Sequence, residues 1–158
     1  MPTHFMKFIP EATIERALAY VESADYELLV QDFADAQPTV LSYLLNESSV
    51  LTAAERDYVL YLAMVVWEAT ERSIEGETPV IGADTLGKAE EENYAKLAEI
   101  KSKDFRERLN VFFENTPQED LLAFVEDALV EGEESDIEIT ETGREPMFVM
   151  LKSMIDSF

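Results

Sequence analysis

An unbroken run of ten apolar residues, from Tyr58 to Trp67, constrains the fold of this chain more than any other feature. Thr52 and Glu55 precede it at the spacing of a capping box, in which the hydroxyl and the carboxylate each accept a hydrogen bond from a backbone N–H at the helix end. The pattern therefore predicts a helix over about 53–72. A helix that is apolar on all of its faces has to be covered on every side, so we expect this one at the centre of the protein.

Helical spacing of apolar residues continues along most of the remaining sequence, and no segment has the sustained alternation that is typical of a strand. Glycine and proline residues predict a loop at about 73–84, and a concentration of acidic residues predicts another at about 131–141. We therefore expect an all-α protein. Residues 1–158 are predicted to form a single compact antiparallel domain of six to eight helices.

The last helix is predicted to begin near Pro146, because Phe148, Leu151, Ile155 and Phe158 then form one apolar stripe at helical spacing. Met147, Met150 and Met154 lie beside an apolar stripe in this segment and are expected in the core. If the helix is more apolar than one chain can cover, a homodimer follows.

Several residue types are rare or missing, which excludes some classes of site. The chain has no cysteine, so disulfides, thiolate nucleophiles, zinc–sulfur sites and iron–sulfur clusters cannot form. His4 is the only histidine, so a histidine metal centre or a Ser–His–Asp triad has almost no residues to be built from. We expect no cofactor, and a non-catalytic protein is favoured over an enzyme.

The expected location follows from two further absences in the sequence. No apolar run approaches the roughly 20 residues that a bilayer-spanning helix needs. Residues 1–10 do not show the pattern of a secretory signal peptide. We therefore expect a cytoplasmic protein.

The charge of the chain is strongly negative and unevenly distributed. There are 34 acidic and 12 basic side chains, which gives a formal net charge of −22. Between Arg108 and Arg144 lie eleven acidic residues and no basic ones, so this window carries −11, half of the total. Such a surface repels phosphate backbones and anionic lipid headgroups, so we expect no direct binding to nucleic acid and none to membranes.

Folding gains nothing from this segregation of charge, because like charges on one face repel each other. One explanation is solubility, which acidic residues promote. The other is a docking face for a basic partner, whose encounter rate long-range attraction would raise. We predict that the protein acts by protein–protein interaction with a basic partner. The residues predicted for the interaction surface are Glu119, Asp120, Glu126, Asp127, Glu131, Glu133, Glu134 and Asp136.

An alternative hypothesis is catalytic. Glu68 and Glu71 share one face of the predicted central helix, and Glu90 and Asn93 repeat their spacing beyond the loop. This pattern resembles the Glu-x-x-Glu and Glu-x-x-Asp pairs of all-α nucleotide pyrophosphohydrolases, although Asn93 stands where an aspartate is expected. The resemblance implies a magnesium-dependent nucleotide (pyro)phosphohydrolase, in which Glu68, Glu71 and Glu90 hold the metal ion against phosphates.

A further alternative is that the protein mimics nucleic acid and inhibits a DNA-binding protein. Such a mimic needs carboxylates that are spaced like backbone phosphates along a rod or ridge. The amino-acid sequence alone does not reveal that spacing.

Overall fold

The computed structural model describes residues 8–46, 50–74, 77–114, 116–131 and 138–158. Within these ranges the chain forms eight helices and no strand, which confirms the predicted all-α class. The helices are α1 (Glu11–Ser23), α2 (Tyr26–Ala36), α3 (Pro38–Leu44), α4 (Ala53–Ser73), α5 (Ala83–Ala98), α6 (Phe105–Phe113), α7 (Glu119–Glu131) and α8 (Glu141–Ser157).

Helix α4 is the predicted central helix, and its start is the predicted capping box. Thr52 Oγ1 accepts a hydrogen bond from the backbone N–H of Glu55 at 3.1 Å, and Glu55 Oε1 accepts one from the N–H of Thr52 at 2.9 Å. Every residue from 62 to 66 is buried, so all faces of the helix are covered there, as expected. Trp67 packs edge-on against Phe33 with ring centroids 5.5 Å apart, which places it at the core.

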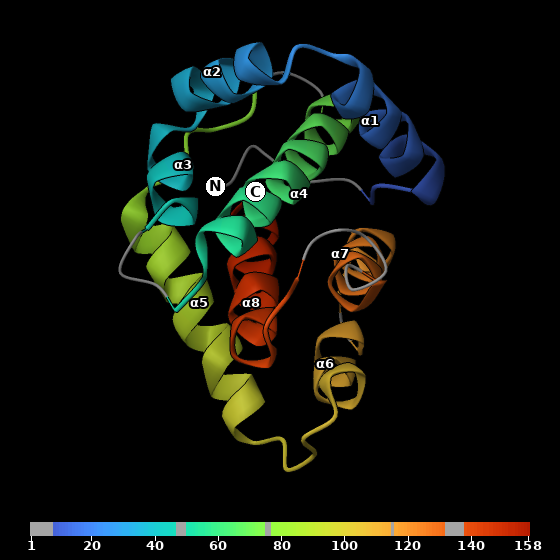
Figure 1. Cartoon of the computed structure of the whole chain (residues 1–158), viewed down its shortest axis with the longest axis vertical. Coiled ribbons are helices and arrows are strands. Elements are labelled where there is room, and N and C mark those ends of the chain that lie inside the picture. Colours follow the sequence, from blue (N-terminus) through green and yellow to red (C-terminus); the bar gives the residue numbers. More distant parts are fainter. Residues whose placement is uncertain (1–7, 47–49, 75–76, 115, 132–137) are drawn as a thin grey trace.

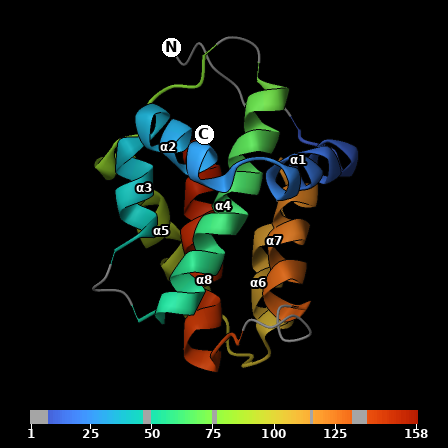
Figure 2. The ribbon, with the colours of Figure 1, turned by 45° about the horizontal axis from the view of Figure 1, so that its top comes forward.

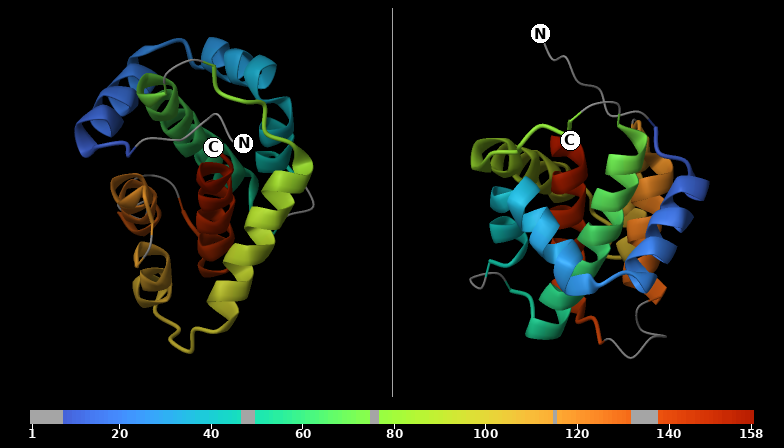
Figure 3. Two further views of the ribbon diagram at one scale, coloured as in Figure 1. Left: turned by 180° about the vertical axis from the view of Figure 1, so that it is seen from behind. Right: turned by 90° about the horizontal axis from the view of Figure 1, so that it is seen from above.

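Helices α4 and α8 form the middle of the protein, and the other helices surround them (Figure 1). Helix α8 lies between α5 on one side and the α6–α7 pair on the other (Figure 3). Helix α1 crosses α4 and reaches α7, as Figure 2 shows, while α2 and α3 pack on another part of α4. Buried side chains from all eight helices join in one hydrophobic cluster. This arrangement makes α1, α4 and α7 neighbours.

The start of α8 differs from the prediction. The helix begins at Glu141, and Pro146 lies in its second turn, where proline removes one backbone hydrogen bond. Thr140 caps the helix, because its Oγ1 accepts a hydrogen bond from the N–H of Gly143 at 3.0 Å. Glu55 then holds Thr140 in place by accepting hydrogen bonds from its N–H at 2.8 Å and from its Oγ1 at 2.9 Å. This contact between distant residues sets the earlier start.

The C-terminal half of α8 is covered by the rest of the chain. Every residue from 147 to 155 is buried, and Met147, Met150 and Met154 lie in the core as predicted. The condition from which a homodimer was expected is therefore not met by this helix. Among the described residues, no helix combines the length and the apolar character that crossing a membrane requires.

Arg108 fastens α6 to the end of α5 and to α8. Its Nε and Nη2 donate to the carboxylate of Glu145 at 2.8 and 3.0 Å. Its Nη1 donates to the carbonyl oxygens of Ile100 and Ser102, both at 3.0 Å. The planar guanidinium suits several fixed acceptors at once. This basic side chain therefore has a structural role that explains its place in an acidic protein.

Candidate functional site

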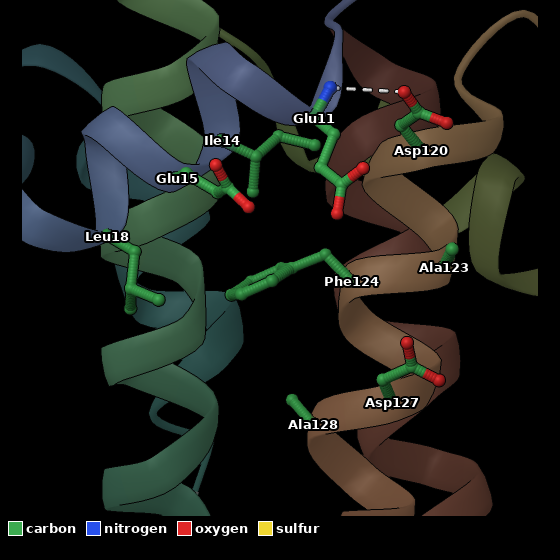
Figure 4. Close-up of a pocket in the computed structure, with 9 residues that line it drawn as sticks. All are labelled: Glu11, Ile14, Glu15, Leu18, Asp120, Ala123, Phe124, Asp127 and Ala128. Atoms are coloured by element: carbon green, nitrogen blue, oxygen red, sulfur yellow. Dashed lines mark hydrogen bonds between the residues drawn. The ribbon is translucent and has the colours of Figure 1, made fainter.

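A groove with a volume of about 360 Å³ runs between α1 and α7 (Figure 4). The residues that line it are Glu11, Ile14, Glu15 and Leu18 from α1, and Asp120, Ala123, Phe124, Asp127 and Ala128 from α7. Its apolar part includes the ring of Phe124, which extends from α7 toward α1. Four carboxylates share the same lining. The groove thus combines an apolar floor with acidic flanks.

Hydrogen bonds join the start of α1 to the start of α7 at one end of the groove. The backbone N–H of Glu11 donates to Asp120 Oδ2 at 3.0 Å, a contact that Figure 4 draws as a dashed line. Just before α1, the N–H of Ile9 donates to Gln118 Oε1 at 3.0 Å. Gln118 directly precedes α7, and Asp120 lies in the first turn of that helix. Because the two helices are joined at this end, the spacing between their acidic side chains is set by the fold.

The α1 side of the groove follows from helical periodicity. Ile14, Ala17 and Val21 are buried and face the core. The neighbouring stripe of the same helix carries Glu11, Glu15, Leu18 and Glu22, at intervals of three and four residues, so these side chains lie along one side of α1. The sequence-based prediction placed no functional residue on α1. The helical spacing of these residues could be seen in the sequence. The sequence did not reveal that α7 packs beside this stripe.

Only some of the residues predicted for an interaction surface line the groove. Asp120 and Asp127 line the groove, whereas Glu119 is exposed on the first turn of α7 and does not line it. Glu126 is half-buried outside the groove lining. Glu133, Glu134 and Asp136 lie outside the described residues, as does the side chain of Glu131, the last residue of α7.

Arg106 of α6 partly balances the charge of α7. Its Nη1 lies 3.0 Å from Glu126 Oε1 and 3.2 Å from Asp127 Oδ1. Burial raises the pKa of Glu126, while the positive charge of Arg106 opposes that rise. Glu126 therefore already has a cationic partner within the protein, and Asp127 shares that partner from the groove lining.

The three carboxylates of the magnesium hypothesis have separate partners. Glu68 pairs with Arg72 at 3.0 Å, and Glu71 accepts a hydrogen bond from Thr78 Oγ1 at 2.6 Å. Glu90, on α5, accepts one from the hydroxyl of Tyr43 at 3.0 Å. In the part of the chain that the structure describes, no group of three or more His, Cys, Asp or Glu residues is arranged to hold a metal ion.

Asn93, where the resemblance expects an aspartate, belongs to a polar cluster between α5 and α8. It is almost completely buried, and its Nδ2 donates to Ser153 Oγ and to Asp156 Oδ2, both at 3.1 Å. Lys152 donates to the same Asp156 oxygen at 2.7 Å. These hydrogen bonds satisfy polar groups at a buried helix interface, so the position has a structural explanation.

The excess of negative charge has a consequence for stability. Because the 34 acidic side chains outnumber the 12 basic ones, we expect added sodium chloride to raise the melting temperature by screening the repulsion between carboxylates. The expected rise is on the order of 5 °C at high salt, or roughly 1–2 kcal/mol for a chain of this size. Mild acid should act in the same direction. Calorimetric melting over a series of chloride concentrations checks this, and a melting temperature that falls steadily with salt would contradict it.

No protein-family model, curated protein or solved structure that was compared with this chain matches it. A proposal for its function therefore rests on the groove itself.

Proposed function

We propose that this protein is a non-catalytic binding protein whose α1–α7 groove takes a basic segment of a partner protein. The observation that carries the proposal is the composition of the groove. Glu11, Glu15, Asp120 and Asp127 accompany an apolar floor that includes Leu18 and Phe124. A purely solubilising surface has no need of that floor, because exposed carboxylates alone provide the repulsion that keeps a protein dispersed.

The chemistry of the groove fits an amphipathic helix with lysine or arginine residues beside its apolar stripe. Apolar anchors of such a helix would bury against Leu18 and Phe124, which supplies hydrophobic free energy. Cations beside the stripe would meet the four carboxylates. The net charge of −22 would also attract a basic partner over a distance and speed its encounter.

The two alternative functions, a mimic of nucleic acid and a magnesium-dependent hydrolase, are not supported by a comparable feature of the described residues. A mimic of nucleic acid calls for carboxylates along a ridge, whereas the acidic side chains of this site accompany an apolar floor in a groove. For the magnesium-dependent hydrolase, Glu68, Glu71 and Glu90 each have a different hydrogen-bonding or ionic partner. The binding proposal is therefore the one that a specific feature of the molecule favours.

The test is a calorimetric titration with a defined probe, an amphipathic helical peptide of leucine and lysine about 14 residues long, or roughly 20 Å. We expect binding at low salt that weakens as salt is added. Glu15→Lys should weaken it about tenfold, because reversing a flanking charge replaces attraction by repulsion. The matched control is Glu91→Lys on α5, an exposed position that changes the net charge by the same amount away from the groove. It should change the affinity less than about twofold.

Two results would contradict the proposal. One is no binding of the peptide at low salt. The other is equal weakening by Glu15→Lys and Glu91→Lys, which would mean that the peptide responds to total charge and not to the groove.

A further inference from the structure

A shallow pocket on α4 lies beside the groove and is lined by Ala54, Asp57, Tyr58 and Tyr61. The two tyrosine rings are nearly parallel, with an angle of 11° between their planes and 6.3 Å between their centroids. Both side chains are half-buried, and Asp57 is exposed. The pocket therefore presents aromatic carbon next to one carboxylate.

Hydrogen bonds fix the orientation of both rings. The hydroxyl of Tyr58 donates to the carbonyl oxygen of Ala128 at 3.0 Å, and that of Tyr61 donates to Glu22 Oε1 at 3.3 Å. Because each hydroxyl proton already has an acceptor within the protein, a ligand in the pocket meets ring carbon and the carboxylate of Asp57. The pocket is pre-formed, so little ordering is needed when a ligand binds.

The same two hydrogen bonds connect the tyrosine pocket to the α1–α7 groove. Ala128, which accepts from Tyr58, also lines the groove. Glu22, which accepts from Tyr61, lies one helical turn beyond Leu18 on the acidic stripe of α1. The stripe from Glu11 to Glu22 spans eleven helical steps, or about 16 Å, which corresponds to three turns of a bound helix. One segment of that length can therefore reach from the groove to the pocket.

The chemistry of the pocket suits a guanidinium group better than an ammonium group. A guanidinium is planar and weakly hydrated, so it can stack on an aromatic face while it donates to a carboxylate. Burial and the negative charge of Glu22 raise the pKa of Tyr61 to about 12, so its ring is that of a neutral phenol at physiological pH. An ammonium would keep more of its water and could not stack in this way.

We propose that the tyrosine pocket binds an arginine side chain of the basic segment that occupies the groove, with Tyr58 and Tyr61 beside the guanidinium plane and Asp57 as its counter-ion. This inference rests on the proposed function, because the segment in the groove brings the arginine to the pocket. The inference predicts that arginine is preferred over lysine at one position of the segment. Charge attraction alone would not distinguish the two residues.

The test uses the leucine–lysine peptide with one added residue at either end, which is arginine, lysine or citrulline. Citrulline resembles arginine in shape but lacks its charge. At the end that reaches the pocket, the arginine peptide should bind about tenfold more tightly than the lysine or citrulline peptide. The gain should disappear in Asp57→Asn and in Tyr61→Leu, while the affinity for the lysine peptide changes less than about twofold.

The outcomes separate this inference from the proposed function. If the lysine peptide binds in the groove and arginine gives no gain at either end, the tyrosine pocket is not an arginine site, and the groove proposal stands. A gain that persists in Asp57→Asn overturns the inference in the same way, and that exposed variant does not depend on a change in the core. If no peptide binds, both proposals fail together.

Discussion

Replacing Glu55 with glutamine is expected to lower the free energy of unfolding by about 3 kcal/mol at neutral pH. Glu55 is fully buried, and its two carboxylate oxygens accept hydrogen bonds from the N–H of Thr52 and from the N–H and hydroxyl of Thr140. Glutamine has one acceptor oxygen and an NH₂ group, so a donor would face a donor and remain unsatisfied. The contacts join the start of α4 to the start of α8.

The effect should depend on pH in a definite direction. Burial by itself raises the pKa of Glu55, but the hydrogen bonds from Thr52 and Thr140 outweigh burial and lower it below the ordinary value of 4.5. A carboxyl whose pKa is lower in the folded state stabilises the fold above its ordinary pKa, and that contribution is lost as pH falls through the folded value. The difference between wild type and Glu55→Gln should therefore be largest at neutral pH and shrink below about pH 4.5.

Urea unfolding followed by circular dichroism, at neutral and at acidic pH, measures this difference. The control is Glu71→Gln, at an exposed position of the same helix, where the change should stay within about 0.5 kcal/mol. Comparing variant with wild type at each pH removes the general relief of charge repulsion by acid. A loss for Glu55→Gln no greater than that of the control would contradict the role assigned to Glu55.

The second large effect concerns two glycines. Replacing one of them by alanine should raise the free energy of unfolding, and replacing the other should lower it. In the interior of a helix, Gly→Ala usually stabilises by about 0.5–1 kcal/mol. Gly87 lies in α5 with nothing within 4 Å of an added Cβ, so Gly87→Ala should show that gain. At Gly143 an added Cβ would lie 2.6 Å from Oε1 and 2.7 Å from Cδ of Glu55. Gly143→Ala should instead cost about 2–3 kcal/mol, because the buried carboxylate must leave its hydrogen bonds.

A double-mutant cycle identifies the cause of that cost. In a Glu55→Ala background the obstructing carboxylate is absent, so adding Gly143→Ala should cost little or give a small gain. Thermal or urea unfolding of the four proteins supplies the coupling free energy. If Gly143→Ala costs the same in both backgrounds, contact with Glu55 is not the reason for the glycine.

The contacts of Glu55 with Thr52 and with Thr140 show which parts of the fold could be predicted from the sequence and which could not. The capping box at Thr52 and Glu55 was predictable because its members are three residues apart and act on one helix end. The contact between Glu55 and Thr140 joins residues 85 positions apart, which no local pattern reveals. The start predicted near Pro146 was therefore five residues too late.

The residues of the groove and of the tyrosine pocket were also predicted only in part. The acidic character of α7 was predictable from the absence of lysine and arginine between residues 108 and 144, and Asp120 and Asp127 were among the residues predicted. The other side of the groove was missed, because Glu11 and Glu15 become its lining only when α1 packs beside α7. The tyrosine pair was not predicted as a site, because both residues belong to the apolar run that predicted a buried helix. Tyr58 and Tyr61 lie near the start of that run, where α4 is only half covered.

Nuclear magnetic resonance of the isotope-labelled protein, titrated with the leucine–lysine peptide, shows where on the surface a basic helix binds. We expect changes in the amide shifts of α1 and α7 along the groove, from Glu11 to Leu18 and from Asp120 to Ala128. Changes centred on α3 and α5, or spread evenly over the acidic surface, would contradict this expectation.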